Sequence, residues 1–410
     1  MSFDTLGLSP RLVARLTEQG FTDPTPIQAQ AIPHAMAGRD VLGLAQTGTG
    51  KTAAFGLPLI HAVTRDGARP GPKSVGALVL APTRELANQI VTALMAISGG
   101  RGGPRITAVV GGKSLHGQTK ALARGTDILV ATPGRLIDLL ERKALTLGTT
   151  GFLVLDEADQ MLDMGFIHAL RRIAPLLPTD RQTMLFSATM PKAMAELSRA
   201  YLTDPVRVEV APPGKPADKV AQSVHFVAKE EKQALLVSML NGHKGDRALV
   251  FARTKHGAER LMKNLDRAGF AAASIHGNKS QGQRDRALAA FRDGGVKVLV
   301  ATDVAARGID IPGVGHVYNF DLPNVPENYI HRIGRTARAG AEGLAIAFCA
   351  ADEMGELRAI EKVLGRSVDV AGGQAWPEAR GAKPGGRKPG GGAGRPRRSR
   401  PSRRPARKAA

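Results

Sequence analysis

The stretch VLGLAQTGTGKT, residues 41–52, joins a short apolar run to a glycine-rich turn, and a helical pattern follows it. Buried parallel strands read as continuous apolar runs, and a turn between such a strand and a helix lets backbone N–H groups surround a phosphate. The Lys51 ammonium can reach β and γ phosphates, and the Thr52 hydroxyl can coordinate Mg²⁺. Ala45 occupies the position where the usual pattern has glycine. We predict an α/β domain whose phosphate-binding loop comprises Thr47, Gly48, Thr49, Gly50, Lys51 and Thr52.

Further apolar runs alternate with helical patterns on the carboxyl side of this loop. The runs lie at 77–82, 128–133, 152–159 and 183–189, and Arg84 to Ile97 shows apolar spacing near 3.6 residues. Such alternation is typical of βαβ units, in which helices cover both faces of a parallel sheet. The sequence therefore predicts a first α/β domain over residues 1–209.

A second α/β domain is expected after a short break. The prolines and glycine of APPGKPADK, at 211–219, cannot continue a helix or a central strand. Beyond them the alternation resumes with SVHFVA, RALVFART, AAASIHG, VKVLVATD, HVYNFDLP and LAIAFCA. We predict a linker over 210–219 and a second domain over 220–366.

The carboxyl-terminal segment differs in composition from both domains. The chain carries a formal charge of +21, and residues 371–410 hold twelve Lys or Arg against one acidic residue. Glycine, proline, arginine and serine bury too little apolar surface to offset the entropy lost on ordering. We expect a disordered basic tail over 367–410, beginning near Val370, that binds polyanions through charge.

Composition also limits the class of protein. A single cysteine, Cys349, excludes an internal disulfide and a zinc site built from several cysteines. The amino terminus lacks a signal pattern, and no apolar run approaches the roughly 18 to 20 residues of a membrane span. We expect a soluble, cytoplasmic, monomeric protein that does not bind membranes. Because the chain is basic, a nucleic acid is a more natural partner than a basic substrate.

Two acidic residues follow the apolar run FLVL. Asp156 and Glu157 would lie at the carboxyl end of a parallel strand, where such sheets bind ligands. Asp156 could hold Mg²⁺ through water, and Glu157 could orient and deprotonate an attacking water. The solvent-exposed first turn of a helix could have the same sequence, but a phosphate loop upstream favours the catalytic interpretation.

Basic residues recur in HRIGRTAR, residues 331–338. His331, Arg335 and Arg338 have the spacing i, i+4 and i+7, which places them on one face if the segment is helical. Arginines delivered from outside the loop can stabilise the charge that develops on a γ phosphate. A basic solvent-facing helix is the alternative. Catalysis by these arginines would require the two domains to close on each other.

Taken together and in order, eight motifs resemble those of the DEAD-box ATP-dependent RNA helicases. They are FTDPTPIQ, AQTGTGKT, PTRELA, TPGR, DEAD, SAT, ATDVAARGID and HRIGRTARAG. The resemblance covers about residues 1–350, and the short flanks with VEVAPPGK are most similar to the bacterial RhlE-type branch. It implies two RecA-like domains in tandem and an RNA-stimulated hydrolase that uses ATP and Mg²⁺.

The resemblance also implies roles for residues that are individually uninformative. Gln28 would read adenine through its amide, and Phe21 would stack on the base or anchor the first helix in the core. Asp310 would contact the ribose. Ser187 and Thr189, which alone read as turn residues, would couple hydrolysis to strand separation, with His331 at the domain interface.

RNA contacts are implied in both domains, mostly to phosphate and sugar. The first domain would contribute Pro82, Thr83, Arg84, Gly111, Gly112, Thr132 and Arg135. The second would contribute Arg253, Gln281, Arg284 and Thr302. Ser280 to Gln283 reads as a capping box, which predicts that Gln281 and Arg284 lie in the first turn of a helix ended by Gly294 and Gly295. The isolated arginines would otherwise be read as ordinary surface residues.

Three functions remain open at this point. The first is an ATP-dependent RNA helicase that locally unwinds or remodels RNA duplexes and RNA–protein complexes. The second is an ATP-gated RNA clamp or scaffold component without productive unwinding. The third, a DNA translocase, is disfavoured by the forms of the DEAD and SAT motifs. By analogy with the family, ribosome assembly particles or an RNA decay complex are the expected partners.

Overall fold

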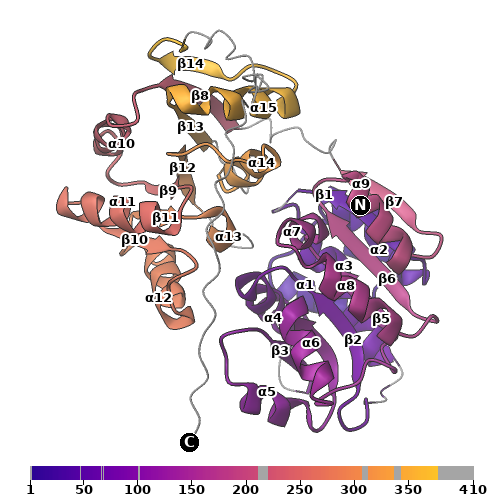
Figure 1. Ribbon diagram of the computed structural model, residues 1–410. Helices are drawn as coiled ribbons and strands as arrows, with labels where there is room; N and C mark the ends of the chain where they lie inside the picture. The colour runs from indigo at the N-terminus through magenta and orange to yellow at the C-terminus, as the bar shows by residue number, and fades with distance from the viewer. Residues whose placement is uncertain are drawn as a thin grey trace, which may run out of the picture. The chain divides into compact units, whose positions relative to one another are not determined.

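A computed structural model describes residues 2–46, 48–65, 67, 69–99, 102–210, 220–306, 313–336 and 343–376. The described chain forms two separate parallel sheets, each flanked by helices (Figure 1). Within the described ranges, none of the helices combines the length and apolar character that crossing a membrane requires.

The first sheet has seven parallel strands in the order β3-β4-β2-β5-β6-β1-β7. The central strands are buried on both faces, which explains their unbroken apolar runs. The strands are β1 (Val41–Ala45), β2 (Val75–Leu80), β3 (Ile106–Val109), β4 (Thr126–Ala131), β5 (Phe152–Leu155), β6 (Gln182–Ser187) and β7 (Val206–Val210).

Helices cover both faces of this sheet and enclose two apolar clusters. Successive side chains of a strand alternate between the clusters, since Val79 packs in one and Leu78 in the other. The segments contributing to the first cluster are η1 (Phe3–Leu6), α1 (Pro10–Glu18), α2 (Pro26–Met36), α3 (Lys51–Arg65) and α4 (Arg84–Ser98). The other face carries α5 (Leu115–Leu122), α6 (Pro133–Glu141), α7 (Ala158–Asp163), α8 (Ile167–Ile173), η2 (Ala174–Leu176) and α9 (Lys192–Tyr201).

The second sheet repeats this plan, with the strand order β10-β11-β9-β12-β13-β8-β14. Its strands are β8 (Val220–Phe226), β9 (Arg247–Phe251), β10 (Ala272–Ile275), β11 (Val298–Ala301), β12 (Val314–Asn319), β13 (Gly343–Cys349) and β14 (Asp369–Gly372). Its helices are α10 (Lys232–Asn241), α11 (Lys255–Arg267), α12 (Gln281–Arg292), α13 (Asp303–Ala306), α14 (Glu327–Ile333), η3 (Ala351–Glu353) and α15 (Met354–Leu364).

The structure confirms the tandem α/β architecture and adds three strands that we did not predict. These are β3, β7 and β14, each at an edge of its sheet. Edge strands are partly exposed, as the burial of β7 and β14 illustrates, so they lack the continuous apolar run of a buried strand. Because β14 pairs with β8, the expectation of disorder from near Val370 was wrong for this short segment. Most of the predicted linker and tail, 211–219 and 377–410, lies outside the described residues.

Candidate nucleotide and nucleic-acid site

The loop between β1 and α3 has the backbone that phosphate binding needs. Gly48 and Gly50 have φ angles of 83° and 92°, in the left-handed region that favours glycine. Lys51 opens α3 and is buried, and its Nζ donates to the Ala45 carbonyl at 3.1 Å. The Thr49 hydroxyl donates to the Gln46 carbonyl at 2.8 Å. Lys51 is therefore held beneath the loop; Thr47 lies outside the described residues.

Gln28 contacts the phosphate loop directly. Its Oε1 accepts from the Thr25 backbone N–H at 2.9 Å as part of the capping box of α2, and its Nε2 donates to the Gly50 carbonyl at 3.1 Å. A Cβ on Gly50 would lie 2.5 Å from that Nε2, so a side chain there would displace the amide. Phe21 is 42% exposed, which leaves its ring available to a ligand rather than in the core.

Asp156 and Glu157 lie at the carboxyl end of β5, beside Lys51. Asp156 Oδ1 is 4.0 Å from Lys51 Nζ and accepts from the Glu157 N–H at 2.9 Å. Burial raises the pKa of both carboxyls, and the Lys51 charge opposes that shift. Arg335 is also close enough to lower the pKa of Glu157. The pair is thus a buried acidic centre with a fixed cation beside it.

Glu157 shows two features expected of a ligand-facing residue. Its φ and ψ of 50° and 51° are left-handed, a conformation that a non-glycine residue adopts at a cost of roughly 1–3 kcal/mol. Its Oε2 is buried and has no hydrogen-bond partner in the protein. A buried carboxylate oxygen without a donor is destabilising on its own, so it is suited to receive a proton from a bound water.

Asp159 joins the acidic loop to the segment that follows β6. Its Oδ2 accepts from the backbone N–H groups of Ala188 and Thr189 at 3.1 and 2.9 Å, and from the Thr189 hydroxyl at 3.0 Å. The Ser187 hydroxyl donates to the Thr189 carbonyl at 2.7 Å. Ser187 and Thr189 therefore lie against the DEAD segment. Sequence analysis gave no role to Asp159, although its place two residues after Glu157 was a signal.

Sequence analysis placed His331, Arg335 and Arg338 on one face if their segment is helical, but the helix does not extend as far as Arg335. Helix α14 ends at Ile333, and Gly334 caps it, so His331 is helical while Arg335 lies beyond the end. Arg335 is buried, and its Nε donates to the His331 carbonyl at 3.2 Å. The i, i+4 relation is thus preserved through one hydrogen bond. Arg338 and Asp310 lie outside the described residues.

The residues proposed to contact RNA in the first domain gather at the carboxyl ends of β2, β3 and β4. Thr83 caps α4 by accepting from the Leu86 N–H, and Thr132 is the N-cap residue of α6. Gly112, with φ of 76°, lies so close to Arg84 that a Cβ would fall 2.1 Å from its Nη1. Arg135 donates to the Lys113 carbonyl at 3.1 Å. Pro82 and Gly111 are neighbours of this group, which presents helix starts and guanidinium groups at one edge.

Gln281 and Arg284 occupy the first turn of α12, as predicted, and the Ser280–Gln283 capping box is present. The Gln281 Oε1 accepts from Arg84 at 3.2 Å, and its Nε2 donates to Glu85 at 2.9 Å. Arg284 lies 3.1 Å from the same Glu85 oxygen and donates to the Ala305 carbonyl. Thr302 is buried before α13, where its carbonyl accepts from Ala305 and Ala306.

Glu85 therefore links predicted RNA-contact residues of the two domains, a role that sequence analysis missed. Its carboxylate is buried and adjoins side chains from α12. Its position directly after Arg84 in the PTRELA motif could have indicated that Glu85 lies near the RNA-contact residues.

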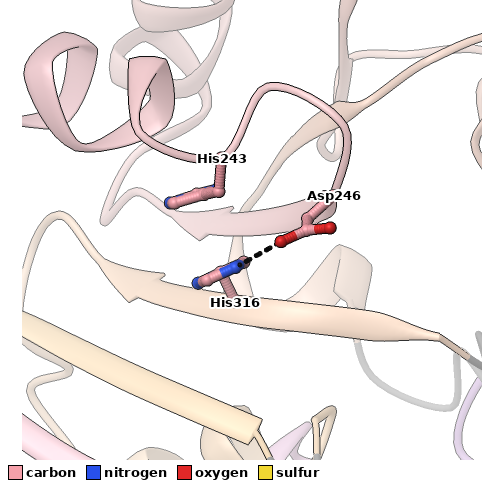
Figure 2. A group of neighbouring side chains, drawn as sticks. All are labelled: His243, Asp246 and His316. Carbon is pink, nitrogen blue, oxygen red and sulfur yellow. Dashed lines mark hydrogen bonds and ion pairs between the residues drawn. The ribbon is translucent and has the colours of Figure 1, made fainter.

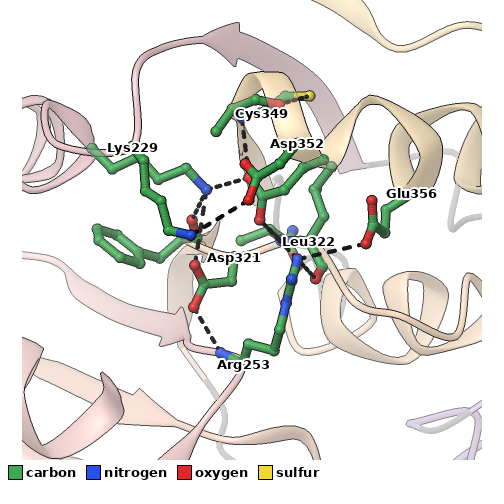
Figure 3. Close-up of polar contacts among 12 residues, drawn as sticks. Lys229, Arg253, Asp321, Leu322, Cys349, Asp352 and Glu356 are labelled. Atoms are coloured by element: carbon green, nitrogen blue, oxygen red, sulfur yellow. Dashed lines mark hydrogen bonds and ion pairs between the residues drawn. The ribbon is translucent and has the colours of Figure 1, made fainter. Parts of the chain in front are cut away.

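Arg253 is held by an ionic network in the second domain (Figure 3). Its Nη2 donates to Glu353 at 3.0 Å and to the Leu322 carbonyl at 3.2 Å, while its backbone N–H donates to Asp321 at 2.8 Å. Buried Lys232 also pairs with Glu353. The Arg253 side chain is one-third exposed, so it has both an internal anchor and a solvent-facing side.

Comparison with known proteins identifies similar sequences over the same two domains. Residues 25–197 match the DEAD/DEAH box helicase family, and residues 231–340 match the helicase conserved C-terminal domain. The chain is 44% identical over 368 residues to the DEAD-box ATP-dependent RNA helicase CshA of Bacillus cereus, covering 90% of this chain and 69% of that protein. The CshA of Bacillus subtilis is 42% identical over 369 residues, covering 90% and 74%.

Solved structures resemble the fold across both domains. Saccharomyces cerevisiae Dbp5 bound to RNA and ADP BeF3 is 34% identical, with a TM-score of 0.81 and coverage of 90% of this chain and 95% of that chain. Mss116p bound to ssRNA and AMP-PNP is 27% identical, with a TM-score of 0.81 and coverage of 92% and 80%. The present chain has two tandem RecA-like domains, each built on a seven-stranded parallel sheet.

Proposed function

Because the chain belongs to the DEAD-box family of ATP-dependent RNA helicases, we propose that its two domains complete one ATPase site between them. The protein is an RNA-dependent ATPase that uses ATP hydrolysis to remodel RNA. The main support for this proposal is the environment of Glu157. Its buried Oε2 has no hydrogen-bond donor in the protein, and Lys51 and Arg335 are positively charged neighbours of its carboxyl group.

The triphosphate site is built from the phosphate loop and the acidic pair. Backbone N–H groups around Gly48, Thr49 and Gly50 would surround the phosphates, and Lys51 would move from the Ala45 carbonyl toward the β and γ phosphates. Phe21 and Gln28 would face the adenine, with Gln28 also fixing the loop through Gly50. Thr47 and Asp310 complete this proposed set.

The residues present fit Mg²⁺. The Thr52 hydroxyl and the Asp156 carboxylate are oxygen donors, which suit this cation, and Asp156 lies buried beside the loop. When bound, Mg²⁺ would neutralise charge on the β and γ phosphates. Glu157 would then orient the attacking water and accept its proton at Oε2.

The second domain would supply positive charge that stabilises the γ phosphate during hydrolysis. Arg335 already lies near enough to Glu157 to influence its pKa, and the bond to the His331 carbonyl fixes its direction. Arg338, three residues further on, is proposed to act with it. Because an arginine delivered this way must reach across the domain boundary, hydrolysis depends on domain closure.

The same closure would shape the RNA surface. Thr189, which donates to Asp159, and Ser187, which donates to the Thr189 carbonyl, would transmit the state of the acidic loop, with His331 on the facing side. We propose that RNA phosphates and sugars take over the contacts of Arg84, Gln281 and Arg284 around Glu85. Backbone contacts of this kind carry little sequence information. The proposed surface comprises Pro82, Thr83, Arg84, Gly111, Gly112, Thr132, Arg135, Arg253, Gln281, Arg284 and Thr302.

The function is tested by steady-state ATPase measured with and without single-stranded RNA, together with displacement of a short RNA duplex. We expect RNA to raise the ATPase strongly, equivalent DNA to do so much less, and ATP to be required for strand displacement. Equal ATPase with and without RNA would contradict the function. ATP-dependent RNA retention without displacement would instead indicate a clamp.

Domain limits and the tail remain proposals. We propose a first domain over 1–209, a linker over 210–219 and a second domain that begins at 220 and includes β14, followed by a basic tail that tethers RNA by charge. Sequence-independent phosphate contacts weaken as salt rises. Deleting 377–410 should therefore weaken RNA binding and flatten its salt dependence while leaving ATPase without RNA unchanged.

Placement of the chain within the DEAD-box family is also a proposal. The segment VEVAPPGK favours the RhlE-type branch, while the curated relatives above are CshA proteins. We also propose a monomeric protein of the bacterial cytoplasm, acting on ribosome assembly particles or in an RNA decay complex. Sequencing RNA fragments crosslinked to the protein in cells would identify its targets.

A further inference from the structure

Two histidines and an aspartate meet at the edge of the second sheet opposite the proposed ATP and RNA residues. His243 follows α10, Asp246 directly precedes β9, and His316 lies near the start of β12. All three are therefore at the amino ends of parallel strands, whereas Arg253 and Thr302 follow carboxyl ends. The proposed function uses none of the three.

The two imidazole rings stack face to face (Figure 2). Their centroids are 3.6 Å apart, and the ring planes differ by 8°. His316 Nε2 lies 3.0 Å from Asp246 Oδ2, and His243 Nε2 lies 2.6 Å from the Tyr318 hydroxyl. Each ring thus has one nitrogen in a hydrogen bond.

The remaining nitrogens have no partner. Nδ1 of His243 and Nδ1 of His316 are both buried and accept or donate no hydrogen bond in the protein. When a neutral imidazole donates through Nε2, its Nδ1 presents a lone pair. In the tautomers that donate through Nε2, both Nδ1 atoms present buried lone pairs without a donor, and a cation would satisfy both.

We propose that His243, Asp246 and His316 form a binding site for a divalent cation of the Zn²⁺ type. One potential ligand atom from each residue lies within 4.8 Å of the others. Two imidazoles with a carboxylate suit Zn²⁺, and a carboxylate that accepts from a ligating histidine is the usual way of fixing its tautomer. Asp246 can serve as that partner or as the third ligand.

Ion binding requires a small rearrangement that the local chain permits. Lone pairs of parallel rings do not converge, so the stack must open to give metal–nitrogen distances of about 2.0–2.1 Å. His243 lies in a turn flanked by Gly242 and Gly245, and a Cβ on Gly245 would meet no atom within 4 Å. The Asp246 side chain is 59% exposed, which gives the ion a path from solvent and leaves room for a water ligand.

The site also adjoins the segment that carries Arg335. The Thr336 hydroxyl donates to the carbonyls of Val314 and Gly315 at 2.5 and 3.2 Å, where the pairing of β12 with β9 shifts register. His316 is the next residue. An ion bound to His316 would stiffen this irregular backbone and its contact with Thr336. Because Thr336 follows Arg335, the ion would then also influence ATP hydrolysis, a consequence that rests on the role proposed for Arg335.

The test is titration of the full-length, tag-free protein with ZnCl₂ by calorimetry, after treatment with chelator and in excess Mg²⁺. We expect one Zn²⁺ per chain, and Co²⁺ in its place should give the visible absorption of a tetrahedral site. Asp246→Asn should weaken Zn²⁺ binding about 10- to 100-fold, and His243→Ala or His316→Ala should weaken it further. His256→Ala, an exposed histidine of α11, is the matched control and should bind like wild type.

Absence of stoichiometric Zn²⁺ binding would overturn the proposal, as would binding that survives in His243→Ala and His316→Ala. Asp246 is exposed, so Asp246→Asn keeps the experiment readable if a histidine variant fails to fold. If stability changes with pH but not with Zn²⁺, the stacked pair of His243 and His316 responds to protons only. That result would also contradict the proposed Zn²⁺ site. Because the titration needs neither ATP nor RNA, its outcome is independent of the proposed function.

Discussion

The protein buries carboxylates at the carboxyl edge of each sheet, but it treats them in opposite ways. In the first domain, Glu157 Oε2 has no hydrogen-bond donor and its backbone is left-handed. In the second, Glu353 accepts from Lys232, Arg253 and the backbone N–H groups of Leu322 and Ala350 (Figure 3). Both carboxyls are nearly inaccessible to solvent.

We propose that this difference distinguishes a ligand site at Glu157 from a structural network at Glu353. A buried charge with a full set of partners fixes the local fold, whereas one left short of donors is a cost that a ligand can relieve. Equal burial and equal residue type therefore do not imply equal roles. The contrast predicts that removing charge at Glu157 harms catalysis, while removing it at Glu353 harms stability.

Glu157→Gln should produce the largest effect. Because the amide cannot accept a proton, we expect kcat for RNA-stimulated ATP hydrolysis to fall about 10²- to 10⁴-fold. The unfolding free energy should stay the same or rise, since no carboxylate is left buried without a donor. Steady-state ATPase and urea denaturation measure the two quantities. Exposed Glu196→Gln is the matched control, and near-normal turnover in Glu157→Gln would contradict the role of this residue.

Glu353→Gln should show the reverse pattern. The Lys232 ammonium would remain buried without its hydrogen-bonded carboxylate and with Asp321 only at 3.9 Å, which should cost about 3–5 kcal/mol of unfolding free energy. Urea denaturation followed by circular dichroism measures the loss. Glu356→Gln, which removes only a 3.9 Å contact to Arg253, should change stability little. If Glu353→Gln and Glu356→Gln were equally stable, the ionic network around Glu353 would not have the structural role that we assign to it.

The pH dependence of stability should also distinguish Glu157. Burial raises its pKa, so in the nucleotide-free protein the carboxyl takes up a proton at a higher pH in the folded than in the unfolded chain. Wild type should therefore gain stability relative to Glu157→Gln as pH falls toward the ordinary carboxyl range, by up to about 1.4 kcal/mol per pH unit. Thermal unfolding of both proteins across that range measures the difference. A difference that does not vary with pH would contradict the raised pKa.

Thr189→Ala should give the smallest effect. The substitution removes one donor from Asp159, but the backbone N–H groups of Ala188 and Thr189 remain. We expect about 0.5–1.5 kcal/mol of lost stability, from thermal unfolding, with Thr203→Ala as the exposed control. A loss as large as that expected for Glu353→Gln would show that the hydroxyl alone holds the acidic loop to this segment.

The fold was predictable from the sequence where burial imposes a hydrophobic pattern. Strands β1, β5 and β9 are buried, and their sequences are apolar runs. The capping box that begins at Ser280 correctly predicted the start of α12. The edge strand β14 carried no such pattern and was missed. The early end of α14 at Ile333 was also missed, because the spacing of the basic residues is compatible with a longer helix.

The site was predictable as a set of residue types but not as a set of contacts. The order of motifs pointed to Lys51, Asp156 and Glu157, which the structure brings together. No one-dimensional pattern indicates that Glu157 has a left-handed backbone, or that Asp159 binds the segment after β6. Nor does one reveal the His243 and His316 stack, since 73 residues separate its members.

The proposed function requires ATP and RNA together to bring Arg335 onto the phosphate site of the first domain. Dyes attached through Ala200→Cys and Asp266→Cys, exposed positions on α9 and α11, would report the distance between the domains by single-molecule energy transfer. Native Cys349 should not compete for dye, because it is buried and burial raises its pKa to about 12. We predict one short-distance population only when a nonhydrolysable ATP analogue and single-stranded RNA are both saturating. A distance distribution that both ligands leave unchanged would contradict the claim.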